Sequence, residues 1–147
     1  MRPVGVRLSL TRSARSGVQT REGSVDHAYK RTRAGGFEET IEAVERAVRA
    51  HGFVIENKYD IGGAVVAKGF AIRPLVIVEV SPAEEVGSPL SLVLPCRINI
   101  YEEGDGVVVA ALRPTVFGAI YPEHRLDELA VGIEQDVIAI VDAAVEQ

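Results

Sequence analysis

Four side chains of this sequence have the chemistry to bind or transform a ligand: Cys96, His27, Tyr59 and Glu134. A thiol can act as a nucleophile, an imidazole as a base, a phenol as a hydrogen-bond donor and a carboxylate as a polar anchor. The four residues form no local motif, so only the fold can bring them together. We predict a small-molecule site between the last helix and a sheet, lined by these residues.

Cys96 has two interpretations. It shares strand parity with Leu94 and Ile98, whereas Arg97 points to the opposite face. A thiol buried among isoleucines has a raised pKa and is inert, which favours a core role. The alternative is a thiol-dependent enzyme or redox sensor. His27 is a poor base for it, because a first strand beside the fifth lies two strand spacings, about 9–10 Å, from the fourth.

The other candidates also have plain structural interpretations. Glu134 falls inside the broad apolar arc of the last helix, either as a rim residue paired with an arginine across an interface or as the polar anchor of a ligand pocket. Tyr59 is typical of half-buried strand tyrosines, and His27 of a polar residue near a domain edge. Glu79 shares a face with Leu75 and Ile77, which predicts an ion pair or hydrogen bond at an interface.

Composition excludes several classes of protein. The chain has 147 residues, 47% of them hydrophobic, which suits one domain with a single core. It holds no apolar run of about 18 residues, so a membrane partner is not expected. A single cysteine and three scattered histidines predict no disulfide and no metal site, and the sequence leaves any cofactor unknown. We expect a cytoplasmic protein, and the excess of arginine over lysine fits a thermophile or a biased genome.

The charge is unevenly distributed. Residues 1–24 contain five arginines and one acidic residue, and they show no hydrophobic period. We predict a disordered basic arm over 1–24 and a single α+β domain over 25–147. The domain carries 11 basic and 20 acidic residues, a net charge of −9, which argues against nucleic acid as its main partner.

The elements follow from hydrophobic period and turn residues. Alternation predicts strands over 25–31, 53–61, 73–80, 90–101 and 106–114, and a period of 3.6 predicts helices over 35–52 and 125–147. A short helix is predicted within 62–70 and a loop over 81–89. In the second strand, Phe53, Ile55 and Tyr59 are expected on one face. The order favours an antiparallel sheet with two main helices on one face, β-α-β4-α.

Two patterns predict a second copy of the chain. The third and fifth strands are apolar on both faces, and the last helix has a second apolar stripe that one sheet face does not need. A partner, a ligand or the 114–122 segment must cover that stripe. Because contiguous apolar surface on a soluble protein usually marks an interface, we predict a two-fold homodimer.

Several stretches together resemble the domain-of-unknown-function family numbered 302. They are "GFEETIEAVERAVRAHGFVI", the "SP" that ends the third strand, "GSPL" and "LVLPCRINIYEEGDGVVVAA". The resemblance covers about residues 25–120 and implies a fold of the TATA-binding-protein-like or helix-grip type, with dimeric members and no agreed activity. The chain departs from the family in Ser81, where relatives carry asparagine, and in a shortened segment before the fourth strand.

These observations give three hypotheses for function. The first is a homodimer, not an enzyme, that binds a small ligand between the last helix and the sheet. The second is the thiol-dependent enzyme or redox sensor that uses Cys96. The third is a purely structural or regulatory dimerisation module.

Overall fold

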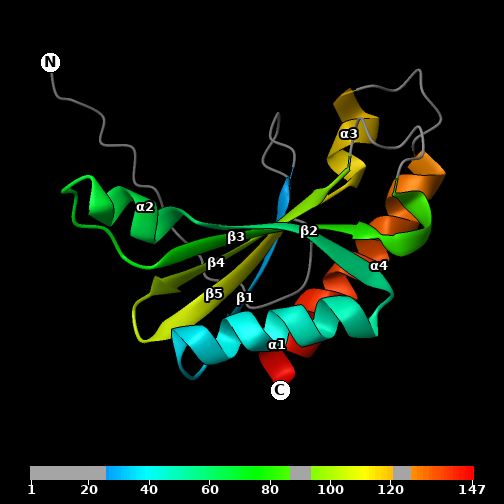
Figure 1. Ribbon diagram of the computed structural model, residues 1–147. Helices are drawn as coiled ribbons and strands as arrows, with labels where there is room; N and C mark the ends of the chain where they lie inside the picture. Colours follow the sequence, from blue (N-terminus) through cyan, green and yellow to red (C-terminus); the bar gives the residue numbers. More distant parts are fainter. Residues whose placement is uncertain (1–25, 87–93, 121–126) are drawn as a thin grey trace, which may run out of the picture.

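The computed structural model describes residues 26–86, 94–120 and 127–147. Within them, five strands form one antiparallel sheet in the order β1-β5-β4-β3-β2 (Figure 1). The strands are β1 (Ala28–Arg33), β2 (Phe53–Asp60), β3 (Leu75–Pro82), β4 (Cys96–Glu103) and β5 (Gly106–Leu112). The predicted α+β class is confirmed, and so is the placing of the first strand beside the fifth.

Helix α1 (Phe37–Ala50) forms where its apolar period predicts it. Ile41, Val44 and Val48 recur at three- and four-residue spacing, and all three are buried. The helix stops at Gly52, which has a φ of 74°. Glycine adopts this left-handed conformation at no steric cost, so it ends the helix and turns the chain into β2.

Helix α4 (Asp127–Glu146) lies with α1 on the same face of the sheet (Figure 1). The two helices and the strands share one core, whose fully buried members include Val48, Val78, Ile98, Val109 and Ile140. Each such side chain contributes about 1.5–3 kcal/mol through removal of apolar surface from water. The prediction of two main helices on one face is confirmed.

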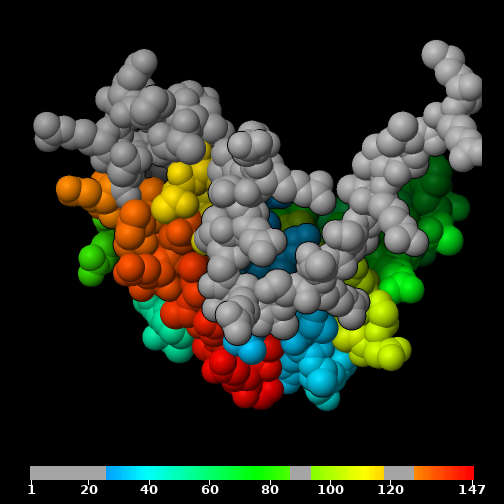
Figure 2. Space-filling model, turned by 180° about the vertical axis from the view of Figure 1, so that it is seen from behind, coloured from blue at the N-terminus to red at the C-terminus, as the bar shows by residue number. Residues whose placement is uncertain are grey.

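The second half of α4 is joined to β1 by polar contacts. The Tyr29 hydroxyl donates to Oδ1 of Asp142 at 2.7 Å, and Arg31 pairs with both Asp142 and Glu146 at 3.0 Å. Arg33 donates to the main-chain carbonyl of Gln147 at 3.1 Å. These contacts hold the end of α4 beside β1. Figure 2 shows this red end of the chain next to blue and cyan segments.

The face of the sheet away from these helices, called here the open face, is a mixed surface. Strand register places Lys30, Ala110, Asn99, Ile77 and Tyr59 side by side in one row across all five strands. This row mixes charged, amide, phenolic and aliphatic side chains. The open face is therefore less apolar than strands β3 and β5 alone suggest.

A β-bulge between Ile55 and Asn57 corrects one expectation. The extra residue reverses the alternation of β2, so Phe53 faces the helices while Tyr59 pairs with Ile77 on the open face. The prediction that Phe53 and Tyr59 share a face is wrong for that reason. Strict alternation in a sequence does not reveal where a bulge occurs.

The connections differ from the predictions in detail. The short helix is confirmed as α2 (Ile61–Ala67), and the loop after β3 contains one helical turn, η1 (Ala83–Glu85). Helix α3 (Thr115–Ile120) is not among the predicted elements, and it packs against α4. Val131 of the second apolar stripe is still 46% exposed, so a cover for that stripe stays a prediction. The predicted arm, residues 1–24, lies outside the described residues.

Candidate functional site

A cavity of about 730 Å³ lies between the first half of α4, the start of β2 and η1. This α4–β2 cavity is the feature that best matches the predicted site between the last helix and the sheet. It is lined by His51, Gly52, Phe53, Pro82, Ala83, Glu84, Glu85, Glu128, Leu129, Gly132, Ile133, Gln135 and Asp136. Ligand pockets in proteins typically measure about 300–1,000 Å³, so a small organic molecule would fit.

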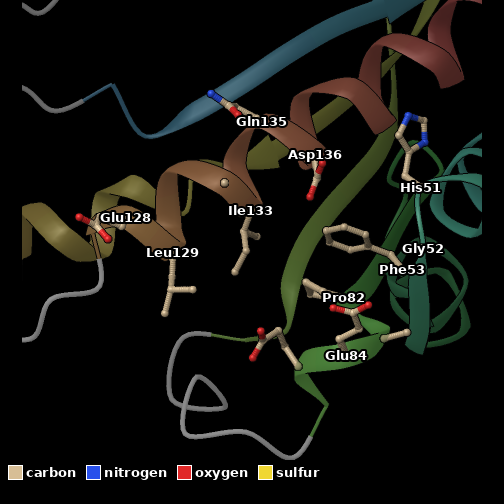
Figure 3. Close-up of a pocket in the computed structure, with 13 residues that line it drawn as sticks. His51, Gly52, Phe53, Pro82, Glu84, Glu128, Leu129, Ile133, Gln135 and Asp136 are labelled. Carbon is tan, nitrogen blue, oxygen red and sulfur yellow. The ribbon is translucent and has the colours of Figure 1, made fainter.

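The inner wall of the cavity is apolar. Phe53 and Ile133 are almost fully buried, at 4% and 9% exposure, whereas Leu129 is 48% exposed. In Figure 3, Leu129, Ile133 and Asp136 point from α4 into the space that Phe53 and Pro82 border on the other side, and Gln135 points away. Leu129 thus presents a large apolar side chain to a space that no described side chain fills.

The rim of the cavity is acidic. Four carboxylates line it, from η1 and α4: Glu84, Glu85, Glu128 and Asp136. The described lining contains neither lysine nor arginine. Within the described residues, no three histidine, cysteine or acidic side chains lie close enough together to hold a metal ion. The rim therefore carries a negative electrostatic field.

His51 is the remaining titratable group of the lining. Its Nδ1 donates to the carbonyl oxygen of Ala47 at 2.7 Å, in the last turn of α1. That bond fixes the orientation of the ring and leaves Nε2 as the nitrogen that can meet a ligand. Nε2 of His51 is thus a polar group of the lining next to the apolar wall.

Cys96 does not line this cavity. It begins β4 on the helix-facing side, pairs with Val80 and is buried. Burial raises the pKa of its thiol to about 11. At neutral pH the group is then a neutral thiol, while the nucleophile in thiol chemistry is the thiolate. Its surroundings support the core interpretation over the thiol-dependent one.

Glu134 is bound within its own chain, away from the cavity lining. Its Oε1 accepts a hydrogen bond from the Thr115 hydroxyl at 2.7 Å, and its Oε2 lies 4.0 Å from the Arg113 guanidinium. Arg113 also lies over the ring of Tyr29, 5.8 Å from its centroid. Glu134 therefore joins α4 to the end of β5 and the start of α3, and its arginine belongs to the same subunit.

Tyr59 and His27 lie on the other side of the sheet from Cys96. The Tyr59 hydroxyl donates to Oε2 of Glu79 at 3.3 Å on the open face, and the exposed His27 lines a second pocket there. The four predicted residues are thus not brought together. The fold divides them between the core, the α3–α4 contact and the open face.

Glu79 is the centre of a polar cluster on the open face. It accepts hydrogen bonds from Asn57 at 3.2 Å and Tyr59 at 3.3 Å, and Nε of Arg97 donates to it at 3.4 Å. These contacts are within one chain. The predicted homodimer, and any interface role for Glu79, stay predictions.

Sequence reasoning did not identify the residues that line the α4–β2 cavity. They come from three separate stretches, 51–53, 82–85 and 128–136, and the rim carboxylates lie up to 52 positions apart between Glu84 and Asp136. One signal was available in the sequence. Leu129 belongs to the main apolar stripe predicted for the last helix and lies near the start of that helix.

In the described part of the chain, no helix is both long enough and apolar enough to cross a membrane.

Comparisons with known proteins agree with this fold. No curated protein matches the chain. The crystal structure of an uncharacterized conserved protein DUF302 from Bacillus stearothermophilus is similar, with a TM-score of 0.75 and 24% sequence identity; the match covers 82% of this chain and 99% of that one. Residues 28–144 match the family model "Domain of unknown function DUF302", and the protein therefore belongs to the DUF302 family.

Proposed function

We propose that this protein is a binding module for a small organic cation with an apolar body, and that the α4–β2 cavity is its site. The observation that carries the proposal is the pairing of an apolar wall with an acidic rim in one cavity of about 730 Å³. An aromatic or aliphatic group would cover Phe53 and the exposed face of Leu129. A positively charged head would then lie among the rim carboxylates.

Magnitudes indicate which part of the ligand gives affinity. Burial of apolar surface contributes about 25 cal/mol per Å², so a phenyl-sized group covering 100 Å² contributes about 2.5 kcal/mol. A solvent-exposed carboxylate such as Asp136 adds about 0.2–1 kcal/mol per ion pair. Affinity thus comes mainly from the apolar wall, while the rim selects the sign of the charge.

Benzylamine, which is protonated at neutral pH, tests the proposal, with benzyl alcohol as its neutral counterpart of similar shape. We expect saturable binding of benzylamine by calorimetry and a higher midpoint of thermal unfolding. At a concentration of 100 times Kd, the stabilisation is about 2.7 kcal/mol. Benzyl alcohol should bind more weakly, and added salt should reduce the difference.

Variants locate the binding. Leu129→Asn removes apolar wall from an exposed position, and Asp136→Asn removes one rim charge. Val131→Asn is the matched control, because Val131 is 46% exposed on the same helix but does not line the cavity. Equal benzylamine affinity in Leu129→Asn and Val131→Asn, or no saturable binding at all, would contradict the proposal.

A further inference from the structure

A second pocket, of about 340 Å³, lies on the open face, on the opposite side of the sheet from the helices. Its floor includes Ala110, which lies between Lys30 on β1 and Asn99 on β4 in the same row. Two strand spacings, about 9.5 Å, separate the backbones of these two neighbours. The pocket exists because a methyl group stands where a larger side chain would close that gap.

The described lining of this pocket has the opposite charge from the α4–β2 cavity. Lys30, Arg97 and His27 line it, and no aspartate or glutamate does. Glu79, next to the pocket, accepts from Nε of Arg97 at 3.4 Å and is itself held by Tyr59 and Asn57. That contact orients the Arg97 guanidinium through Nε, so its two terminal nitrogens can point at a ligand.

Neutral lining residues complete the site. Asn99 can donate from its amide and Tyr101 from its hydroxyl, while Ile77 and Leu112 provide apolar surface. Lys30 and Arg97 carry two positive charges and Glu79 one negative charge, which leaves one positive charge for a ligand. A monoanion with an apolar body neutralises this single positive charge and covers the aliphatic side chains. A phosphate dianion exceeds the charge and has no apolar part.

We infer that the open-face pocket binds a small organic monocarboxylate, with Lys30 and Arg97 at its carboxylate and Ile77 and Leu112 at its hydrocarbon. This site is separate from the α4–β2 cavity and does not depend on it. Its ligand has the opposite charge and enters from the opposite face of the sheet.

Benzoate is the test ligand, with benzamide as the neutral molecule of the same shape. Calorimetry should show saturable benzoate binding with a Kd of about 1 mM or tighter, and at least tenfold weaker binding of benzamide. Backbone amide shifts in NMR spectra should cluster on β1, β4 and β5. Benzylamine should leave those amides unshifted.

Four variants separate a built pocket from general electrostatic attraction. Arg97→Gln and Lys30→Gln should each weaken benzoate binding about tenfold, since both side chains are exposed and the fold does not rest on them. Lys68→Gln removes a positive charge from an exposed position at the end of α2, and it should leave the affinity unchanged. Ala110→Leu fills the floor without changing any charge and should abolish binding.

Two results overturn the inference. One is benzoate binding that Lys68→Gln weakens as much as Arg97→Gln, which would show attraction to net charge only. The other is a dimer, seen by sedimentation velocity, that Arg97→Gln or Ala110→Leu dissociates while wild-type protein binds no benzoate. The open face would then be covered by a second copy of the chain.

Discussion

The two halves of α4 have the same kind of sequence but different surroundings. In the second half, Ile140, Val141 and Ala144 are fully buried, and Asp142 and Glu146 are paired with β1. In the first half, Leu129 is 48% exposed and faces the α4–β2 cavity. The second half of the helix is thus fixed in the core, while residues of the first half line the α4–β2 cavity.

The difference teaches that an apolar stripe does not by itself specify core. Leu129 belongs to that stripe but is 48% exposed, although Ala130 and Ile133 near it are buried. Its side chain is therefore available to a ligand. A helix held firmly at one end can position such a wall without burying it.

The largest expected effect is a loss of stability when a buried side chain of α4 is truncated. An exposed side chain of the same helix serves for comparison. Ile140→Ala should lower the free energy of unfolding by about 3 kcal/mol, because it leaves a void in a close-packed region. Leu129→Ala should cost less than about 1 kcal/mol, because water already reaches the side chain. Urea denaturation followed by circular dichroism measures both. Equal losses would mean that the cavity is closed in solution.

A smaller effect is expected at the polar contacts of the second half. Asp142→Asn weakens the acceptor of the Tyr29 hydroxyl and removes the partner charge of Arg31, and we expect a loss of about 1 kcal/mol. Asp136→Asn, an exposed aspartate of the first half, is the matched control and should change stability by less than about 0.5 kcal/mol. If the two variants unfold alike, the contacts with β1 do not fix the helix end.

The smallest expected effect is on the pH dependence of stability and concerns Cys96. It appears only in alkaline solution. Burial raises the pKa of its thiol from 9.0 in the unfolded chain to about 11 in the folded one, so folding favours the protonated form. Its contribution to stability is complete below pH 9 and is lost as the pH rises through 11. Cys96→Ala should show a shallower loss of stability between pH 9 and 11 than wild type.

Tyr29 supplies the internal control for that profile. Burial, together with its hydrogen bond to Asp142, raises the pKa of Tyr29 above the ordinary value of 10.0. Ionisation of Tyr29 therefore also lowers the stability of the folded protein as the pH rises above 10. This loss should persist in Cys96→Ala.

Rapid alkylation of Cys96 by iodoacetamide in the folded protein at pH 7 would contradict the burial of the thiol and revive the thiol-dependent hypothesis.

The sequence predicted the fold better than the site. Helix α1 and the strands follow from side-chain period, and Gly52 marks the end of α1 in the sequence as in the structure. The face of Tyr59 did not follow, because the bulge in β2 depends on pairing with β3 rather than on the residues of β2 alone. The sequence indicates that Glu134 needs a polar partner, but it does not identify Thr115 and Arg113, which lie about 20 positions away.

The sequence by itself determined which residues alternate or recur, and therefore the elements, their order and the core-facing side of Cys96. Only the tertiary structure decided that Leu129 borders a cavity and not the core, and that Ala110 lies between Lys30 and Asn99. The physical reason is the range of each effect. Periodicity acts over a few neighbouring residues, whereas a cavity is the space left between elements, and its shape depends on strand register and packing together.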